Sequence, residues 1–201
     1  MTRRRLSWGV RALLFAVLVA NGVLVLPYLR ALWWLHAYRT VPAAVVLPVR
    51  GASPQELSPS FGAPRYAGPH EGIDIVAPFG TPVVAAAGGV VIGNRPTAIG
   101  GNVVWLMGAG RRMYYYAHLR ELAPGMHMGR FVTAGEQIGT VGDTGNAVGT
   151  PPHLHFAIYL VTSWFYPLRH HAIDPYPILV EAGASTMTPP AGGAGDQRSG
   201  R

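Results

Sequence analysis

The chain has 201 residues, 49% of them hydrophobic, and a formal net charge of +7 that comes from 16 basic residues, all arginine, and 9 acidic ones. This length allows one domain of ordinary size with flanking segments, and the apolar content allows both a sizeable core and a membrane segment. The lack of cysteine excludes disulfides and thiolate metal sites, and the lack of a long basic stripe with interleaved aromatic residues argues against nucleic-acid binding.

Residues 1–40 predict a separate N-terminal membrane anchor. Arginines at 3–5 and at Arg11 precede an uncharged run, residues 12–29, which is close to the roughly 20 residues that a spanning helix needs. Because basic flanks stay in the cytoplasm, we expect residues 8–35 to lie in lipid and the rest of the chain to lie across the membrane. A cleaved signal peptide is the alternative, which the large Leu18 disfavours. Aromatic residues that suit a membrane interface lie at the end of the run and just after it: Tyr28, Trp33, Trp34 and Tyr38.

Residues 41–57 form a proline-rich stretch that we expect to be a linker. Its prolines favour an extended course, and residues 45–49 are apolar enough for a short edge strand. At the other end, residues 181–201 are mostly small and polar. They cannot bury enough apolar surface to offset the entropy of ordering, so we expect a disordered tail there.

Residues 58–180 predict a mainly β domain. Short apolar runs alternate with glycine turns such as Gly88-Gly89 and Gly100-Gly101. Regularly spaced short strands of this kind are typical of an antiparallel sheet or sandwich, and we expect no helix of ordinary length after the anchor. The predicted strands are residues 72–76, 82–86, 89–92, 103–107, 112–118, 137–141 and 154–159.

Two histidines, His153 and His155, lie two residues apart at the start of the last strand. Because side chains alternate between the two faces of a strand, both rings should point the same way. Such a pair can hold one metal ion with both rings, or hold it with one ring and use the other for chemistry.

A second group lies upstream, where His70 and Asp74 are four residues apart and supply one nitrogen and one oxygen ligand. Together with one histidine of the pair they make three protein ligands. A Zn²⁺ ion with three protein ligands keeps an open position for water, as catalytic zinc sites do. The sequence therefore favours a catalytic zinc site over a closed structural one.

His118 is a further candidate because it ends the aromatic run 113–117, which has strand character. A histidine at a strand end can reach a metal site, although taken alone it is more often a half-buried structural residue. Glu71 lies between the upstream ligands and is expected to point away from them. No functional role is expected for the other histidines, His36, His127, His170 and His171.

Over about residues 58–178 the chain resembles the lysostaphin-type, or LytM-domain, zinc metalloendopeptidases. The segments that carry the resemblance are Ser60-Phe61-Gly62 with Arg65, His70-Glu71-Gly72-Ile73-Asp74, Gly80-Thr81-Pro82-Val83, Ala85-Ala86-Ala87-Gly88-Gly89-Val90, Gly101-Asn102, Tyr116-Ala117-His118-Leu119, Gly135-Glu136-Gln137-Ile138-Gly139, Gly142-Asp143-Thr144-Gly145 and His153-Leu154-His155-Phe156.

The resemblance implies a LytM-type β fold and one zinc ion held by His70, Asp74 and His155, with His118 and His153 as the catalytic pair. It implies hydrolysis of peptide bonds in bacterial peptidoglycan, in crosslinks or stem peptides, during cell-wall remodelling. With the anchor, it implies a single-pass inner-membrane protein whose catalytic domain is periplasmic. One departure, the longer approach of residues 149–152 to the histidine pair, is expected to reshape the substrate groove without abolishing activity.

The chain has no His-Glu-x-x-His motif, so the catalytic histidines must move the protons. One is expected to take a proton from water, while the other stabilises the oxyanion or protonates the leaving amine; which does which stays open. The alternative function is a non-cutting envelope module that binds wall peptides or regulates an amidase. A structural zinc in an unrelated β domain is a third reading, and a need for a protein activator is also left open.

Overall fold

The computed structural model describes residues 45–65, 68–163 and 169–187, together with single positions between 7 and 32. Most of the predicted anchor, and residues 188–201 of the predicted tail, lie outside this part of the chain. Within the described part, no helix is both long and apolar enough to cross a membrane.

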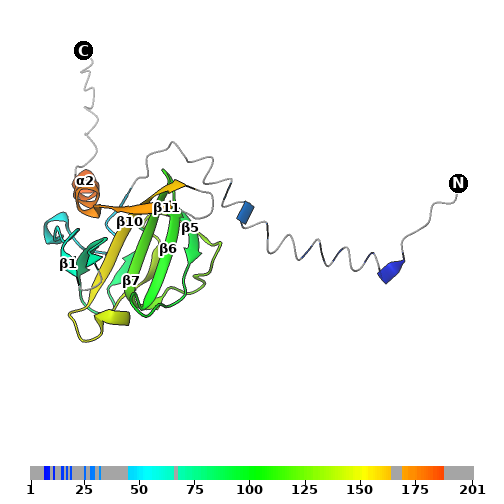
Figure 1. Ribbon diagram of the computed structural model, residues 1–201, viewed down its shortest axis with the longest axis horizontal. Helices are drawn as coiled ribbons and strands as arrows, with labels where there is room; N and C mark the ends of the chain where they lie inside the picture. Colours follow the sequence, from blue (N-terminus) through cyan, green and yellow to red (C-terminus); the bar gives the residue numbers. More distant parts are fainter. Residues whose placement is uncertain are drawn as a thin grey trace, which may run out of the picture.

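Nine strands join in one sheet, and all of its pairings are antiparallel. Figure 1 shows β10, β7, β6 and β5 running side by side, with the helix α2 at one end of the domain. The main path runs β11 (Arg169–Ile173), β10 (His153–Ser163), β7 (Arg112–Leu122), β6 (Asn102–Gly108), β5 (Gly89–Gly93) and β8 (Phe131–Val132). Off this path, β3 (Ile73–Val76) pairs with β10, and β9 (Gln137–Val141) pairs with both β7 and β4 (Pro82–Val84).

The prediction of a mainly β, antiparallel fold is confirmed, and every predicted strand is present. The unpredicted strands are β11, β8 and the two-residue pair β1 (Pro64–Arg65) and β2 (Gly68–Pro69), which forms a separate small sheet. Three of these four are only two residues long, too short to show a period in the sequence. The remaining elements are the 3-10 helices η1 (Pro54–Glu56) and η2 (Gly145–Ala147) and the helix α2 (Pro175–Met187).

Strand β10 places the core and the histidine pair on opposite faces of the sheet. Leu154, Phe156 and Ile158 are fully buried in the main core. The intervening positions carry His153 and His155, whose side chains therefore project from the other face. The alternation in the sequence thus fixes which face carries the chemistry.

The segment predicted to be a linker, residues 41–57, belongs to the domain over its described part. Val49 forms an antiparallel bridge with Val83, so the predicted edge pairing is present. Val49 and Leu57 are both buried in the main core. The prolines allow this segment to lie extended along the sheet, and its apolar side chains attach it.

The prediction that no helix of ordinary length follows the anchor is wrong, because α2 spans Pro175–Met187. The prediction that a disordered tail begins at residue 181 is wrong for the same reason. Leu179 anchors the helix with a fully buried side chain. Gly183 lies against the ring of Pro54 so closely that a Cβ atom would collide with it. The small residues that suggested disorder therefore let the helix approach η1, and tertiary packing overrides weak local propensity.

Candidate active site

Strands β3 and β10 bring the predicted metal ligands together. Asp74 and His155 are register partners across these strands, and His70 lies three residues before β3 begins. His155 Nδ1 lies 3.1 Å from Asp74 Oδ1, and His70 Nε2 lies 3.2 Å from the same oxygen. The two ring nitrogens are 2.9 Å apart. Two nitrogens and one oxygen therefore converge on one point.

This donor set fits zinc. The other ring nitrogen of His70, Nδ1, lies 2.9 Å from the carbonyl oxygen of Ser60, which can only accept a hydrogen bond. Nδ1 therefore donates to this carbonyl, and the His70 nitrogen that is placed to bind a metal ion is Nε2, which faces Asp74. Nitrogen and carboxylate ligands in a set of three suit a four-coordinate Zn²⁺ with one open position.

Asp74 is held as a carboxylate. Arg65 Nη2 donates a hydrogen bond to Asp74 Oδ2 at 2.6 Å, which leaves Oδ1 facing the histidines. Burial alone would raise the pKa of Asp74, but the hydrogen bonds and charges of His155 and His70 outweigh it and lower the pKa well below its ordinary value. Asp74 is therefore ionised at neutral pH, as a metal ligand must be.

Gly72 lets the two strands approach closely enough to build this cluster. A Cβ atom at Gly72 would collide with the carbonyl oxygen of Phe156 and would lie 3.0 Å from Cε1 of His155. Only a residue without a side chain fits here while β3 and β10 stay paired.

His118 and His153 lie beside the three-residue cluster. Their ring centroids are 5.0 Å apart, and the ring of His118 is 6.0 Å from that of His155. Each ring donates from Nδ1 to a backbone carbonyl, His118 to Thr144 at 2.8 Å and His153 to Pro151 at 2.9 Å. The nitrogen left for chemistry on each neutral ring is therefore Nε2.

A bulge in β7 aims His118 at the site. Between the register pairs Val104–Tyr116 and Asn102–Leu119, β7 has one residue more than β6. His118 takes the left-handed backbone conformation there, with φ 59°. Such bulges redirect side chains next to active sites, and residues other than glycine seldom adopt this conformation without a reason. Burial lowers the pKa of His118, against the opposing effect of its hydrogen bond to Thr144, so the ring is held in its neutral form.

The structure thus brings all five sequence-predicted residues into one cluster. Glu71 accepts a hydrogen bond from the hydroxyl of Tyr159 at 2.9 Å, in keeping with a role outside the ligand set. Of the other histidines, His127, His170 and His171 are exposed, and His36 lies outside the described residues. Sequence reasoning gave no role to Thr144, which was named only within one of the segments that carry the resemblance. The feature that gives Thr144 a role is the contact of its backbone carbonyl with His118, 26 residues away in the sequence. A local sequence pattern does not reveal such a contact.

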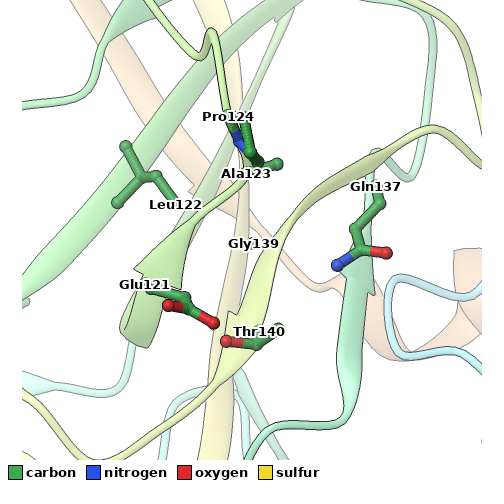
Figure 2. A pocket seen from close by; sticks show the side chains of 7 residues that line it. All are labelled: Glu121, Leu122, Ala123, Pro124, Gln137, Gly139 and Thr140. Carbon is green, nitrogen blue, oxygen red and sulfur yellow. The ribbon is translucent and has the colours of Figure 1, made fainter.

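A separate shallow pocket lies between the end of β7 and β9 (Figure 2). Glu121 and Thr140 project toward each other across it. None of the five clustered residues lines this pocket, so it has no part in the site described above.

Comparisons with known proteins agree with this geometry. Residues 68–175, more than half of the chain, match the model of "Peptidase family M23". Among solved structures, the chain is similar to lysostaphin from Staphylococcus simulans, with 31% identity and a TM-score of 0.53 over 67% of this chain and 55% of that one. It is also similar to lytM from Ruminococcus gnavus, with 29% identity and a TM-score of 0.57 over 73% of this chain and 61% of that one. The expected LytM-type fold is therefore confirmed.

Curated relatives include an L-Ala--D-Glu endopeptidase of Bacillus subtilis, 36% identical over 127 residues, which are 59% of this chain and 36% of that protein. The peptidoglycan DD-endopeptidase ShyA of Vibrio cholerae is 37% identical over 90 residues, 45% of this chain and 20% of that protein. The matched region thus spans about a third or less of each of these relatives. Together with the donor set of the site, these matches show that the chain belongs to peptidase family M23, a family of zinc-dependent metallopeptidases.

Proposed function

We propose that this chain is an endopeptidase that hydrolyses peptide bonds of bacterial peptidoglycan, in crosslinks or in stem peptides. His70, Asp74 and His155 would hold one zinc ion, and His118 and His153 would move the protons. The observation that carries the proposal is that two further histidines, each with its Nδ1 engaged by a backbone carbonyl, lie against a three-ligand cluster. A structural zinc site would need a fourth ligand and no such neighbours.

Zinc, when bound, lowers the pKa of a coordinated water toward about 7 and polarises a carbonyl oxygen. His118 and His153 would carry out the proton transfers and stabilise the developing negative charge. One accepts through Nε2 the proton that water loses as its oxygen bonds to the carbonyl carbon. The other, in its protonated form, donates a hydrogen bond through Nε2 to the oxygen on which negative charge develops. As the carbon–nitrogen bond breaks, a protonated ring returns a proton to the leaving amine.

Support for the substrate comes from two directions. The relatives in Bacillus subtilis and Vibrio cholerae carry the names of peptidoglycan or L-Ala--D-Glu endopeptidases. The net charge of +7 favours a polymer that carries carboxylates, as stem peptides do.

The test is digestion of purified sacculi, with the released muropeptides identified by mass. We expect crosslinked dimers to fall to monomers, or stems to be shortened, and we expect His153→Ala to abolish the release. The exposed His127 offers a matched control, because His127→Ala removes an imidazole whose Nδ1 bonds to the carbonyl of its neighbour Met128. A wild-type protein that binds zinc, binds sacculi and releases nothing would overturn the proposal in favour of a non-cutting regulator.

We also propose that residues 8–35 anchor the chain in the bacterial inner membrane, with the domain in the periplasm. The basic residues at 3–5 and the uncharged run 12–29 support this topology. An alkaline phosphatase fused after residue 201 should be active in cells, and the full chain should sediment with membranes. Release of the chain by salt alone, or an inactive fusion, would contradict the anchor.

A further inference from the structure

Thr144 makes three hydrogen bonds around His118. Its carbonyl oxygen accepts from His118 Nδ1 at 2.8 Å. Its hydroxyl donates to the carbonyl of Leu119 at 2.8 Å and accepts from the backbone N–H of Asn102 at 2.9 Å. One side chain therefore joins the residue that follows His118 to the neighbouring strand β6.

The Thr144 hydroxyl lies where β6 and β7 pair again after the bulge that contains His118. Asn102 and Leu119 are register partners across β6 and β7, at the end of the bulge that contains His118. The Thr144 hydroxyl bridges the N–H of one partner and the carbonyl of the other. The hydroxyl thus replaces the strand-to-strand hydrogen bonding that the left-handed His118 interrupts. It also connects the loop of Thr144 to the bulge.

Close packing leaves this loop little freedom. Gly101 has φ +63°, and a Cβ atom there would collide with the Thr144 hydroxyl. Gly145 has φ +72°, and a Cβ atom there would collide with the backbone of Gly101. The Thr144 carbonyl is therefore fixed in place from both sides, and the imidazole that donates to it is fixed too.

We propose that Thr144 is a positioning residue that holds His118 in the Nδ1–H tautomer and in the orientation needed for proton transfer. The inference rests on the proposed endopeptidase function of the same site. Thr144 acts through His118, and its hydrogen bonds go to His118, Leu119 and Asn102. Without its hydroxyl the carbonyl shifts, and the ring loses its fixed direction.

The kinetic test compares Thr144→Val, Thr144→Ser and His118→Ala. Valine keeps the shape of threonine and removes the hydroxyl, so we expect kcat to fall about 10- to 100-fold with KM and zinc content unchanged, because misplacement of a catalytic group has effects of that size. Serine restores the hydroxyl and should restore most of kcat. In a His118→Ala background, Thr144→Val should cost nothing further, since residues that act as one unit are not additive.

The matched control is Thr81→Val, which also removes one hydroxyl hydrogen bond, donated to the Pro78 carbonyl and not to the bulge that contains His118. Thr144→Ala serves as the second variant where valine impairs folding, which circular dichroism reports. An equal loss from Thr144→Val with and without His118, or no rescue by serine, would overturn the inference.

A second readout does not depend on catalysis. Long-range ¹H–¹⁵N NMR reports which nitrogen of His118 carries the hydrogen. We expect the Nδ1–H tautomer in the wild type and a mixture in Thr144→Val. An unchanged tautomer in Thr144→Val would overturn the inference, whether or not the wild-type protein is active. A wild-type protein that is inactive on sacculi, together with the expected NMR change in the variant, would count only against the proposed function.

Discussion

Asp74 and His155 face each other as register partners on the adjacent antiparallel strands β3 and β10, with Oδ1 of one 3.1 Å from Nδ1 of the other. A slip of one residue between these strands would turn one of the two side chains to the opposite face. The candidate metal site is therefore part of the β ladder, and its integrity depends on strand pairing as well as on ligand identity.

Arg65 should tune metal affinity through Asp74. Its side chain is about half exposed and donates to the carboxylate oxygen that faces away from the histidines. Arg65→Ala should therefore weaken zinc binding by about 10- to 100-fold, as loss of an outer partner of a metal ligand typically does. Competition with a chromogenic chelator measures the affinity. Because the Arg65 side chain is about half exposed, the free energy of unfolding should change little. Unchanged zinc affinity would show that Arg65 does not orient Asp74.

Gly72 should be intolerant of any side chain. In Gly72→Ala the new Cβ would meet the Phe156 carbonyl, so β3 and β10 must separate. We expect the free energy of unfolding to fall by about 1–3 kcal/mol, the usual cost of overpacking, together with a loss of zinc affinity. Urea denaturation measures the first quantity.

Gly88 is the matched control for that substitution, because the atom nearest to an added methyl group would be the Val132 carbonyl oxygen, at an ordinary 3.6 Å. Gly88→Ala should change the unfolding free energy by less than about 1 kcal/mol. Equal losses in the two variants would remove close strand approach as the explanation.

His153 should be dispensable for zinc and needed for turnover. Its Nε2 lies 4.0 Å from Asp74 Oδ1, farther than the ligand nitrogens of His70 and His155. His153→Ala should keep the zinc and lose about 10²- to 10⁴-fold in kcat, the range for a lost general acid or base. Metal analysis of the purified variant decides the point: if zinc is lost with the ring, His153 is a ligand and the assignment to His155 is wrong.

His118 should make stability depend on pH in the mildly acidic range. Burial lowers its pKa below the ordinary 6.5, so below that pH the unfolded chain binds this proton more readily than the native protein. The free energy of unfolding should therefore fall as pH drops through 6.5, and it should fall less steeply in His118→Gln. Urea denaturation at a series of pH values measures both slopes, and parallel slopes would contradict a neutral, buried ring.

The sequence was most informative where local pattern and chemistry coincide. The alternation around His153 and His155 predicts a strand with both rings on one face, and the glycine turns predict the antiparallel sheet. What local pattern cannot supply is contact between distant segments. The buried Val49 and Leu57, the helix that packs through Gly183, and the left-handed His118 each depend on a partner far away in the chain.

The most direct test uses a soluble fragment that begins at Val41, which retains the segment that packs into the core. Zinc is removed with a chelator and returned stepwise while release of peptides from sacculi is followed, with circular dichroism recorded in parallel. We expect activity to vanish without metal while the β signal remains, and to be restored in full at one zinc per chain, but not in His155→Ala. Release that survives chelation, or that His155→Ala supports, would contradict a catalytic zinc on His70, Asp74 and His155.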